Sequence, residues 1–177
     1  MRRGPSPVLR AATAADIPAI EALIHRSVHG LMAGHLTPEQ RQVALGTVLG
    51  VDRQLIADGT YFVVETDAAM VGAGGWSRRA TLYGVPTGEP RALDPSREPA
   101  RIRAMFIDPA FARRGIGRLI LERAEHDARA AGFSSIELMA TPTGIEFYVK
   151  NGYAGEDAPI PLPDGSAMAG RVMRKTL

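Results

Sequence analysis

The segment 101–140 constrains the fold more than any other part of the chain, because it contains a strand, a glycine turn, a long helix and a second strand in succession. Residues 101–107 alternate in polarity and end at Asp108-Pro109, and the apolar residues of 115–131 recur at helical spacing up to Gly132. Residues 135–140 are rich in apolar residues and complete a strand–helix–strand crossover. The segment therefore predicts a mixed α/β fold.

The alternation in 101–107 predicts two strand faces. One face carries Ile102, Ala104 and Phe106, and the other carries Arg103, Met105 and Ile107.

The remaining elements follow from periodicity and turn signals. The sequence predicts a strand at 8–10, a helix at 17–31, a Gly-broken helical stretch from Thr37-Pro38 to about Asp58, a hairpin of 61–65 with 70–77, a long loop at 84–100 and a short helix at 144–150. The tail has a turn at 163–165 between two strands, the second near 169–175. The predicted order is β-α-α-β-β-β-α-β-α-β-β. We expect a single domain over 1–177, with 1–7 as a loose tail.

Glycines at positions 72, 74 and 75 weaken the second strand of the hairpin and allow something to approach its backbone closely.

Composition excludes several classes of protein. The chain has 177 residues, 45% of them hydrophobic and 23% charged, which suits one globular domain. It has no apolar run of about 18 residues and no apolar stretch typical of a signal peptide, so we expect no membrane partner and a cytoplasmic location. The absence of Cys excludes disulfides and a Cys nucleophile. A net charge of +2 is too small to indicate a nucleic-acid partner.

The turn at 108–118 has the features of an anion site. Gly115 and Gly117 allow close backbone approach at the start of a long helix, where free amides carry partial positive charge. Arg113, Arg114 and Arg118 add cationic donors. A helix cap with solvated arginines explains the same residues. The segment is neither a P-loop nor a dinucleotide fingerprint, because Lys-Ser/Thr and a third Gly are missing.

A tyrosine on the short helix at 144–150 is the second chemical feature. Tyr148 carries a phenol that keeps its proton at neutral pH, so it can donate that proton to a leaving group. A half-buried packing role is the alternative.

The two features together resemble a known family. "FIDPAFARRGIGRLIL", then "IELMAT", then "FYVKNGY" is similar to the GNAT superfamily of acyl-CoA-dependent N-acyltransferases. The upstream helices and hairpin match that family's order, so the resemblance covers most of the chain. It implies a central, mostly antiparallel sheet flanked by helices.

The resemblance also implies an acetyl-CoA site. In that family the strand before the loop binds the pantetheine arm, and the loop amides bind the pyrophosphate. Ala112 stands where the family has Arg or Gln, and Thr141 stands near a position where the family often has Asn. The cofactor-binding residues implied here are Met105, Phe106, Ile107, Arg113, Arg114, Gly115, Ile116, Gly117, Arg118 and Thr141.

The reaction implied by the resemblance is transfer of the acetyl group of acetyl-CoA to a primary amine of a small molecule or peptide. Tyr148 takes the position of the general acid, and a backbone N–H near Phe106 polarises the carbonyl. Glu137 is the candidate base, Glu65 is a second one, and a water chain is a third route. The alternative is an acetyl-CoA-binding regulatory module that has lost catalysis.

Other residues suggest weaker sites. Trp76 and Tyr83, with Arg78 and Arg79, are candidates for a wall of the acceptor site, although Trp76 also suits the core.

Glu21, His25 and His29 share a helix face, which a solvated surface explains better than a metal site, so we expect no metal. His29 and His35 are candidates for contact with the substrate. An exposed sheet edge would allow a homodimer.

Overall fold

The computed structural model describes residues 6–67 and 69–177. The elements are β1 (Val8–Ala11), α1 (Ile17–Leu31), α2 (Pro38–Ala44), α3 (Arg53–Ala57), β2 (Tyr61–Glu65), β3 (Met70–Ser77), β4 (Ala100–Ile107), α4 (Ile116–Ala130), β5 (Ser135–Ala140), α5 (Ile145–Lys150), β6 (Ala154–Asp157), β7 (Ile160–Pro161), β8 (Ala167–Met168) and β9 (Arg171–Thr176), with short 3-10 turns at Ala14–Asp16 and Pro109–Phe111. Most of the predicted loose tail, residues 1–5, lies outside the described residues.

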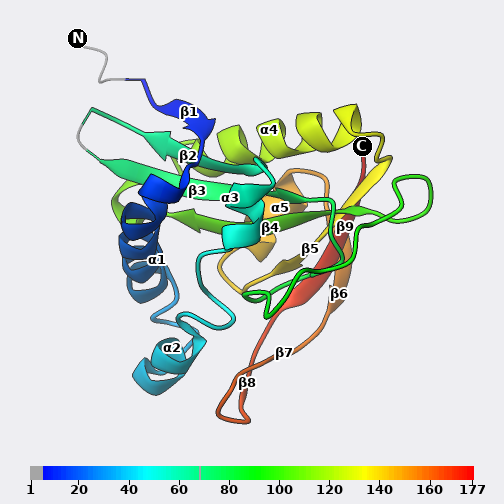
Figure 1. The fold of residues 1–177 in the computed structure, drawn as a ribbon. Helices are drawn as coiled ribbons and strands as arrows, with labels where there is room; N and C mark the ends of the chain where they lie inside the picture. Colours follow the sequence, from blue (N-terminus) through cyan, green and yellow to red (C-terminus); the bar gives the residue numbers. More distant parts are fainter. Residues whose placement is uncertain (1–5, 68) are drawn as a thin grey trace.

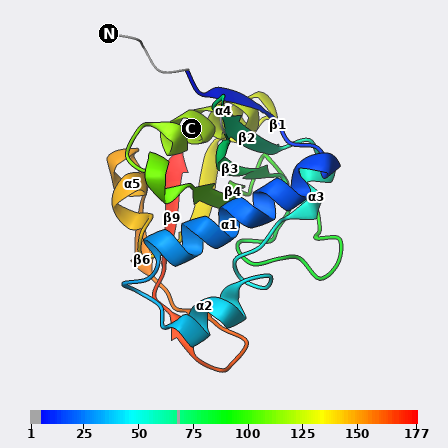
Figure 2. The same cartoon turned by 90° about the vertical axis from the view of Figure 1, so that its left-hand side faces the viewer.

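A seven-stranded sheet in the order β1-β2-β3-β4-β5-β9-β6 forms the centre of the molecule. Every neighbouring pair is antiparallel except β4 and β5, which the α4 crossover makes parallel. Helices α1 and α4 cover opposite faces of the sheet, and α5 lies on the α4 side (Figure 1, Figure 2). The predicted fold class, a mostly antiparallel sheet flanked by helices, is confirmed.

The glycines of β3 let helix α4 approach the sheet closely. All eight residues of β3 are buried. A Cβ on Gly72 would collide with Ile116, and a Cβ on Gly74 would collide with the side chain of Met105. What approaches this strand is therefore α4 and the neighbouring strand β4.

Strand β4 contains a bulge that corrects the predicted alternation. Ala104 has a positive φ of 49°, and the register between β3 and β4 shifts at this point. Ile102 therefore packs in the α4-side core, whereas Phe106 packs in the α1-side core, so the two do not share a face. The hydroxyl of Tyr61 donates to the carbonyl of Ala104 (2.8 Å) and holds the bulge.

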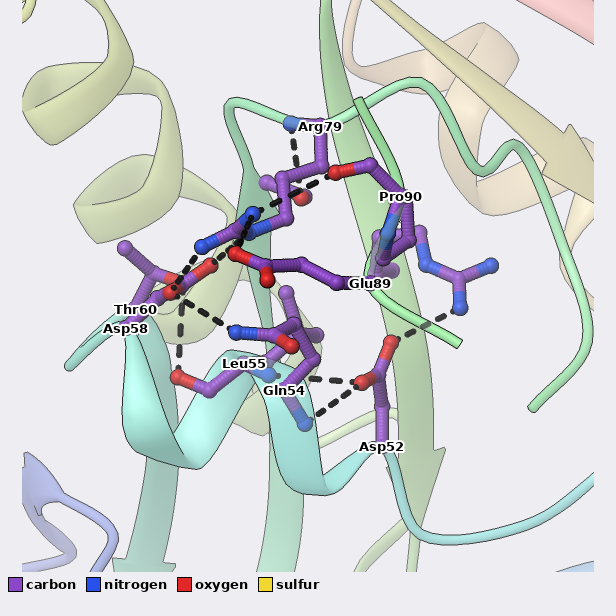
Figure 3. Close-up of polar contacts among 10 residues, drawn as sticks. Asp52, Gln54, Leu55, Asp58, Thr60, Arg79, Glu89 and Pro90 are labelled. Atoms are coloured by element: carbon purple, nitrogen blue, oxygen red, sulfur yellow. Dashed lines mark hydrogen bonds and ion pairs between the residues drawn. The ribbon is translucent and has the colours of Figure 1, made fainter. Parts of the chain in front are cut away.

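The helical stretch predicted for 37–58 is two short helices instead of one. Gly46 adopts a positive φ of 80° after α2, and residues 45–52 are irregular. Asp52 then begins α3, because its Oδ1 accepts hydrogen bonds from the N–H groups of Gln54 (3.0 Å) and Leu55 (3.3 Å) (Figure 3).

The long loop before β4 is tied to the rest of the fold. Arg79 donates to Asp58 at the end of α3 (2.7 Å), to Glu89 (3.1 Å) and to the carbonyl of Pro90 (3.2 Å) (Figure 3). The N–H of Val85 donates to the carbonyl of Thr47 (2.7 Å), which joins this loop to the α2–α3 segment.

The tail strands predicted around the turn at 163–165 are each divided into two pieces. β6 and β7 precede the turn, and β8 and β9 follow it. Within residues 6–67 and 69–177, no helix is both long enough and apolar enough to span a membrane.

Candidate active site

Strands β4 and β5 separate soon after they begin, and this separation creates the main cavity. Their pairing is limited to Ala100 with Ile136 and Arg101 with Glu137. Beyond these pairs, a cavity of about 760 Å³ is lined by both strands, the C-terminal part of α1, the start of α4, α5 and residues 82–84. Strands β4 and β5 are neighbours near the centre of the sheet (Figure 1).

The edge of β4 that faces the cavity has free backbone groups. The N–H of Asp108 donates to the carbonyl of Val71 on β3 (2.9 Å). Because backbone groups alternate along a strand, Phe106 also bonds toward β3, whereas Ile107 and Met105 turn their N–H and C=O groups toward the gap. Of the three residues predicted here, Met105 and Ile107 present a free backbone edge and Phe106 does not.

The loop before α4 gathers free amides. Gly115 has a φ of 85° and Arg113 a φ of 62°, so the chain turns sharply before the helix begins at Ile116. Within the described part of the chain, the N–H groups of residues 113–118 have no hydrogen-bond acceptor. Their partial positive charge suits an anion with several oxygens.

Two of the three loop arginines line the cavity. Arg113 and Arg118 are exposed, and each has an acidic neighbour, Glu146 at 3.8 Å and Glu122 at 2.7 Å. Arg114 does not line the cavity, and its guanidinium lies 5.3 Å from the ring centre of Phe111.

Tyr148 lines the cavity from helix α5. Its ring makes edge contacts with Phe147 (5.1 Å between centroids) and Tyr153 (5.6 Å). Burial raises the pKa of the Tyr148 phenol well above its usual value, so the hydroxyl keeps its proton. That hydroxyl has no hydrogen-bond partner among the described residues.

A buried polar cluster supports the ring next to Tyr148. The hydroxyl of Tyr153 donates to Glu125 (2.9 Å), and Lys175 also donates to Glu125 (3.0 Å). Burial is the main cause of the raised pKa of Tyr153.

Thr141 lines the cavity, and its hydroxyl lies 3.3 Å from that of Thr143.

Neither candidate base lies at the cavity. Glu137 is bound by Arg174 (2.6 Å) and Arg101 (3.3 Å), because it sits on β5 at the closed end of the gap. Glu65 is bound by Arg10 (2.8 Å) near the β1 edge. Glu137 thus lies on the expected strand but outside the cavity lining, and among the described lining residues the carboxylates are Asp52 and Glu146.

Of the residues predicted to form a wall of the acceptor site, one lines the cavity and three do not. Tyr83 lines the cavity and is 38% exposed. Trp76 is buried in the α4-side core against Phe133 (6.1 Å), because its β3 position faces that core. Arg78 lies over the Trp76 ring and Arg79 is bound as described above, so none of these three belongs to the cavity wall.

A buried ion pair at the cavity was not predicted. Arg103 Nη2 donates to Asp52 Oδ2 (2.8 Å), and the two side chains are 3% and 4% exposed. The same nitrogen donates to the carbonyl of Gly84 (2.6 Å). The partners are 51 residues apart in the chain, and the only local signal was an Asp before a short helix.

The histidines stand apart from the cavity. His25 and His29 have ring centroids 6.1 Å apart, and neither they nor His35 line it. In the described residues, no group of three or more His, Cys, Asp or Glu side chains is arranged to hold a metal ion.

Known proteins share this architecture. A crystal structure of a GCN5-related N-acetyltransferase from Rhodopseudomonas palustris has a TM-score of 0.71 at 19% identity and covers 100% of this chain and 99% of its own. PaiA N-acetyltransferase from Thermoplasma acidophilum, in complex with coenzyme A, has a TM-score of 0.67 at 17% identity, with coverage of 97% and 99%.

Sequence comparison agrees with the structural likeness. An IAA acetyltransferase of Azospirillum brasilense is 38% identical over 66 residues, which span 36% of this chain and 43% of that protein. The family model for the acetyltransferase (GNAT) domain matches residues 57–154. This match takes in the open strand edge, the amide-rich loop and Tyr148. The chain therefore belongs to the GNAT acetyltransferase family.

Proposed function

We propose that this protein is an acetyl-CoA-dependent N-acetyltransferase that acts on a primary amine of a small molecule or peptide. One observation carries the proposal: the residues of the free β4 edge, most residues of the amide-rich loop and Tyr148 all line one cavity. An anion site, an extended-chain site and a proton donor are the parts that acyl transfer from a coenzyme A thioester requires.

The residues at the cavity fit acetyl-CoA, which supplies an activated acetyl group. The amides of 113–118 suit its diphosphate, with Arg113 and Arg118 as further donors. The free N–H and C=O groups of Met105 and Ile107 suit an extended arm that itself contains amides, because that arm can bond to the edge as an added strand. Ala112 removes one side-chain contact from the loop and leaves the backbone donors intact.

Two groups then serve the chemistry. The N–H of Met105, next to the bulge at Ala104, is positioned to polarise the carbonyl under attack. The hydroxyl of Tyr148 gives its proton to the departing sulfur, and the raised pKa ensures that the proton is present at neutral pH. The amine loses its proton to water, since the cavity carboxylate of Asp52 is committed to Arg103 and that of Glu146 to Lys150 (2.6 Å).

Calorimetry and thiol release test the proposal together. We expect acetyl-CoA and free CoA to bind at micromolar concentration and near 1:1 stoichiometry. We expect Tyr148→Phe to lower kcat by about 100-fold, at the low end for a proton donor because the thiolate is a fair leaving group, while the Kd for acetyl-CoA stays within about twofold.

The outcomes distinguish an active acetyltransferase from an acetyl-CoA-binding regulatory module that has lost catalysis. Absence of binding by the folded protein would refute the acetyl-CoA site. Binding without thiol release across a broad amine panel would favour the regulatory module. An unchanged kcat in Tyr148→Phe, measured with a true acceptor, would remove Tyr148 from the mechanism.

A further inference from the structure

The part of the cavity beyond the donor features has its own character. The donor features come from residues 105–118 and 141–151, so the rest of the lining is available to the acceptor. We call this part the acceptor end. Its polar side chains are Ser27, Asp52 and Arg103, and six of its other side chains are Leu31, Met32, Val48, Leu82, Tyr83 and Ile160.

All six of these side chains are apolar or aromatic, and they come from four separate segments of the chain. Met32 and Ile160 are buried, Leu31, Val48 and Leu82 are half-buried, and Tyr83 is at the rim. Thioether and aromatic side chains pack favourably against aromatic rings. The walls therefore suit an apolar ligand.

The charged groups at the acceptor end satisfy each other. Asp52 uses Oδ1 on the amides of Gln54 and Leu55 and Oδ2 on Arg103. The result is a neutral pair in which Oδ1 accepts two hydrogen bonds and Oδ2 accepts one.

Arg103 likewise offers no bidentate face to an acidic ligand. A carboxylate binds a guanidinium through two adjacent N–H groups, and both such forks include Nη2. Nη2 already donates to Asp52 Oδ2 and to the carbonyl of Gly84, so each fork has lost one of its two hydrogens.

We propose that the acceptor is an aromatic primary amine without a second charged group. This inference rests on the proposed acetyl transfer and narrows its substrate. An added ammonium or carboxylate would enter the acceptor end without a partner, and a buried unpaired charge is strongly unfavourable. An apolar ring fills the same space at no such cost.

Conjugates of coenzyme A test the proposal by binding, independently of turnover. The sulfur of CoA is joined through an acetyl spacer to the nitrogen of 2-phenylethylamine, phenylalanine or 1,5-diaminopentane. Phenylalanine differs from 2-phenylethylamine only by a carboxylate, and the diamine adds a second ammonium. We expect calorimetry to show the phenylethylamine conjugate binding about 100-fold more tightly than either charged conjugate, and more tightly than CoA.

A carboxylate introduced at the acceptor end tests the same reasoning, because it should provide a partner for a ligand with a second ammonium. Leu82→Asp places a carboxylate among these side chains, and Leu82→Asn is its uncharged match of equal size. We expect the diaminopentane conjugate to bind about tenfold more tightly to Leu82→Asp than to Leu82→Asn. Circular dichroism of both variants checks that each one folds.

Each result bears on one claim. If a charged conjugate binds the unaltered protein as tightly as the phenylethylamine conjugate, or if no conjugate exceeds CoA, the aromatic-amine inference is wrong and the donor site stands. If CoA itself does not bind, the proposed function fails first.

Discussion

Asp52→Asn tests whether the buried ion pair at the cavity stabilises the fold. Asparagine keeps a side-chain oxygen at Oδ1, so it can still accept the two N–H groups that begin α3. The change removes the charge that faces Arg103 and replaces its acceptor, Oδ2, with an NH2 group that can only donate.

The expected loss of stability follows from the burial of the Asp52–Arg103 pair. The Asp52 and Arg103 side chains are 4% and 3% exposed and their charged atoms are 2.8 Å apart, so water can scarcely replace the missing partner. Removing one member of such a pair costs about 3–5 kcal/mol. At 2–4 °C per kcal/mol for a chain of this size, the Tm should fall by about 6–20 °C.

Urea unfolding followed by circular dichroism measures this loss. An exposed pair on α4 provides the matched control: Glu122→Gln, whose partner Arg118 lies 2.7 Å away, should cost about 0.5 kcal/mol or less. Adding Arg103→Met to Asp52→Asn removes the unpaired charge and should recover most of the lost stability. A loss below about 1 kcal/mol in Asp52→Asn would refute the reasoning, because the pair would then behave like an exposed one.

Three further predictions follow from the geometry. Gly115→Ala places a Cβ at a φ of 85°, so it should lower the free energy of unfolding by about 1–2 kcal/mol and weaken acetyl-CoA binding. The control is Gly34→Ala, whose Cβ meets nothing within 4 Å, and it should change neither quantity. Equal affinities of the two variants for acetyl-CoA in calorimetric titrations would contradict this prediction. Glu137→Gln should leave kcat within about twofold, because the carboxylate lies outside the cavity, and a large fall in the thiol-release assay would restore it as the base. The hydrogen bond from Arg79 lowers the pKa of Asp58, so its stabilisation is complete above the unfolded pKa of about 4 and is lost as the pH falls through the lower folded pKa. In urea unfolding, the stability difference between the native protein and Arg79→Met should therefore shrink below pH 4, and a pH-independent difference would show that Asp58 carries no such linkage.

Local signals predicted most of the fold. The helices at α1 and α4 follow from apolar periodicity, and the hairpin of β2 and β3 follows from two apolar runs around a turn. Gly115 and the amides after it also came from local sequence, since a glycine before a long amphipathic helix indicates a sharp turn with free N–H groups. These features depend on neighbours within a few residues.

The errors share a different cause, because each depends on contacts between distant segments. The bulge at Ala104 exists because of the register with β3 and the hydroxyl of Tyr61, and an alanine gives no local sign of positive φ. Glu137 is paired with Arg101 and Arg174 outside the cavity lining, and only the assembled sheet reveals the approach of these two arginines. The ion pair of Asp52 is invisible for the same reason.

The short pairing of β4 with β5 has a consequence for how the domain withstands heat. Two residue pairs join the two halves of the sheet directly, so a molecule that bonds to Met105 and Ile107 adds backbone links where the protein has none. By mass action, a ligand at a hundred times its Kd adds about 2.7 kcal/mol to the free energy of unfolding. The unsatisfied edge thus couples the thermodynamic stability of the folded domain to the supply of its acyl donor.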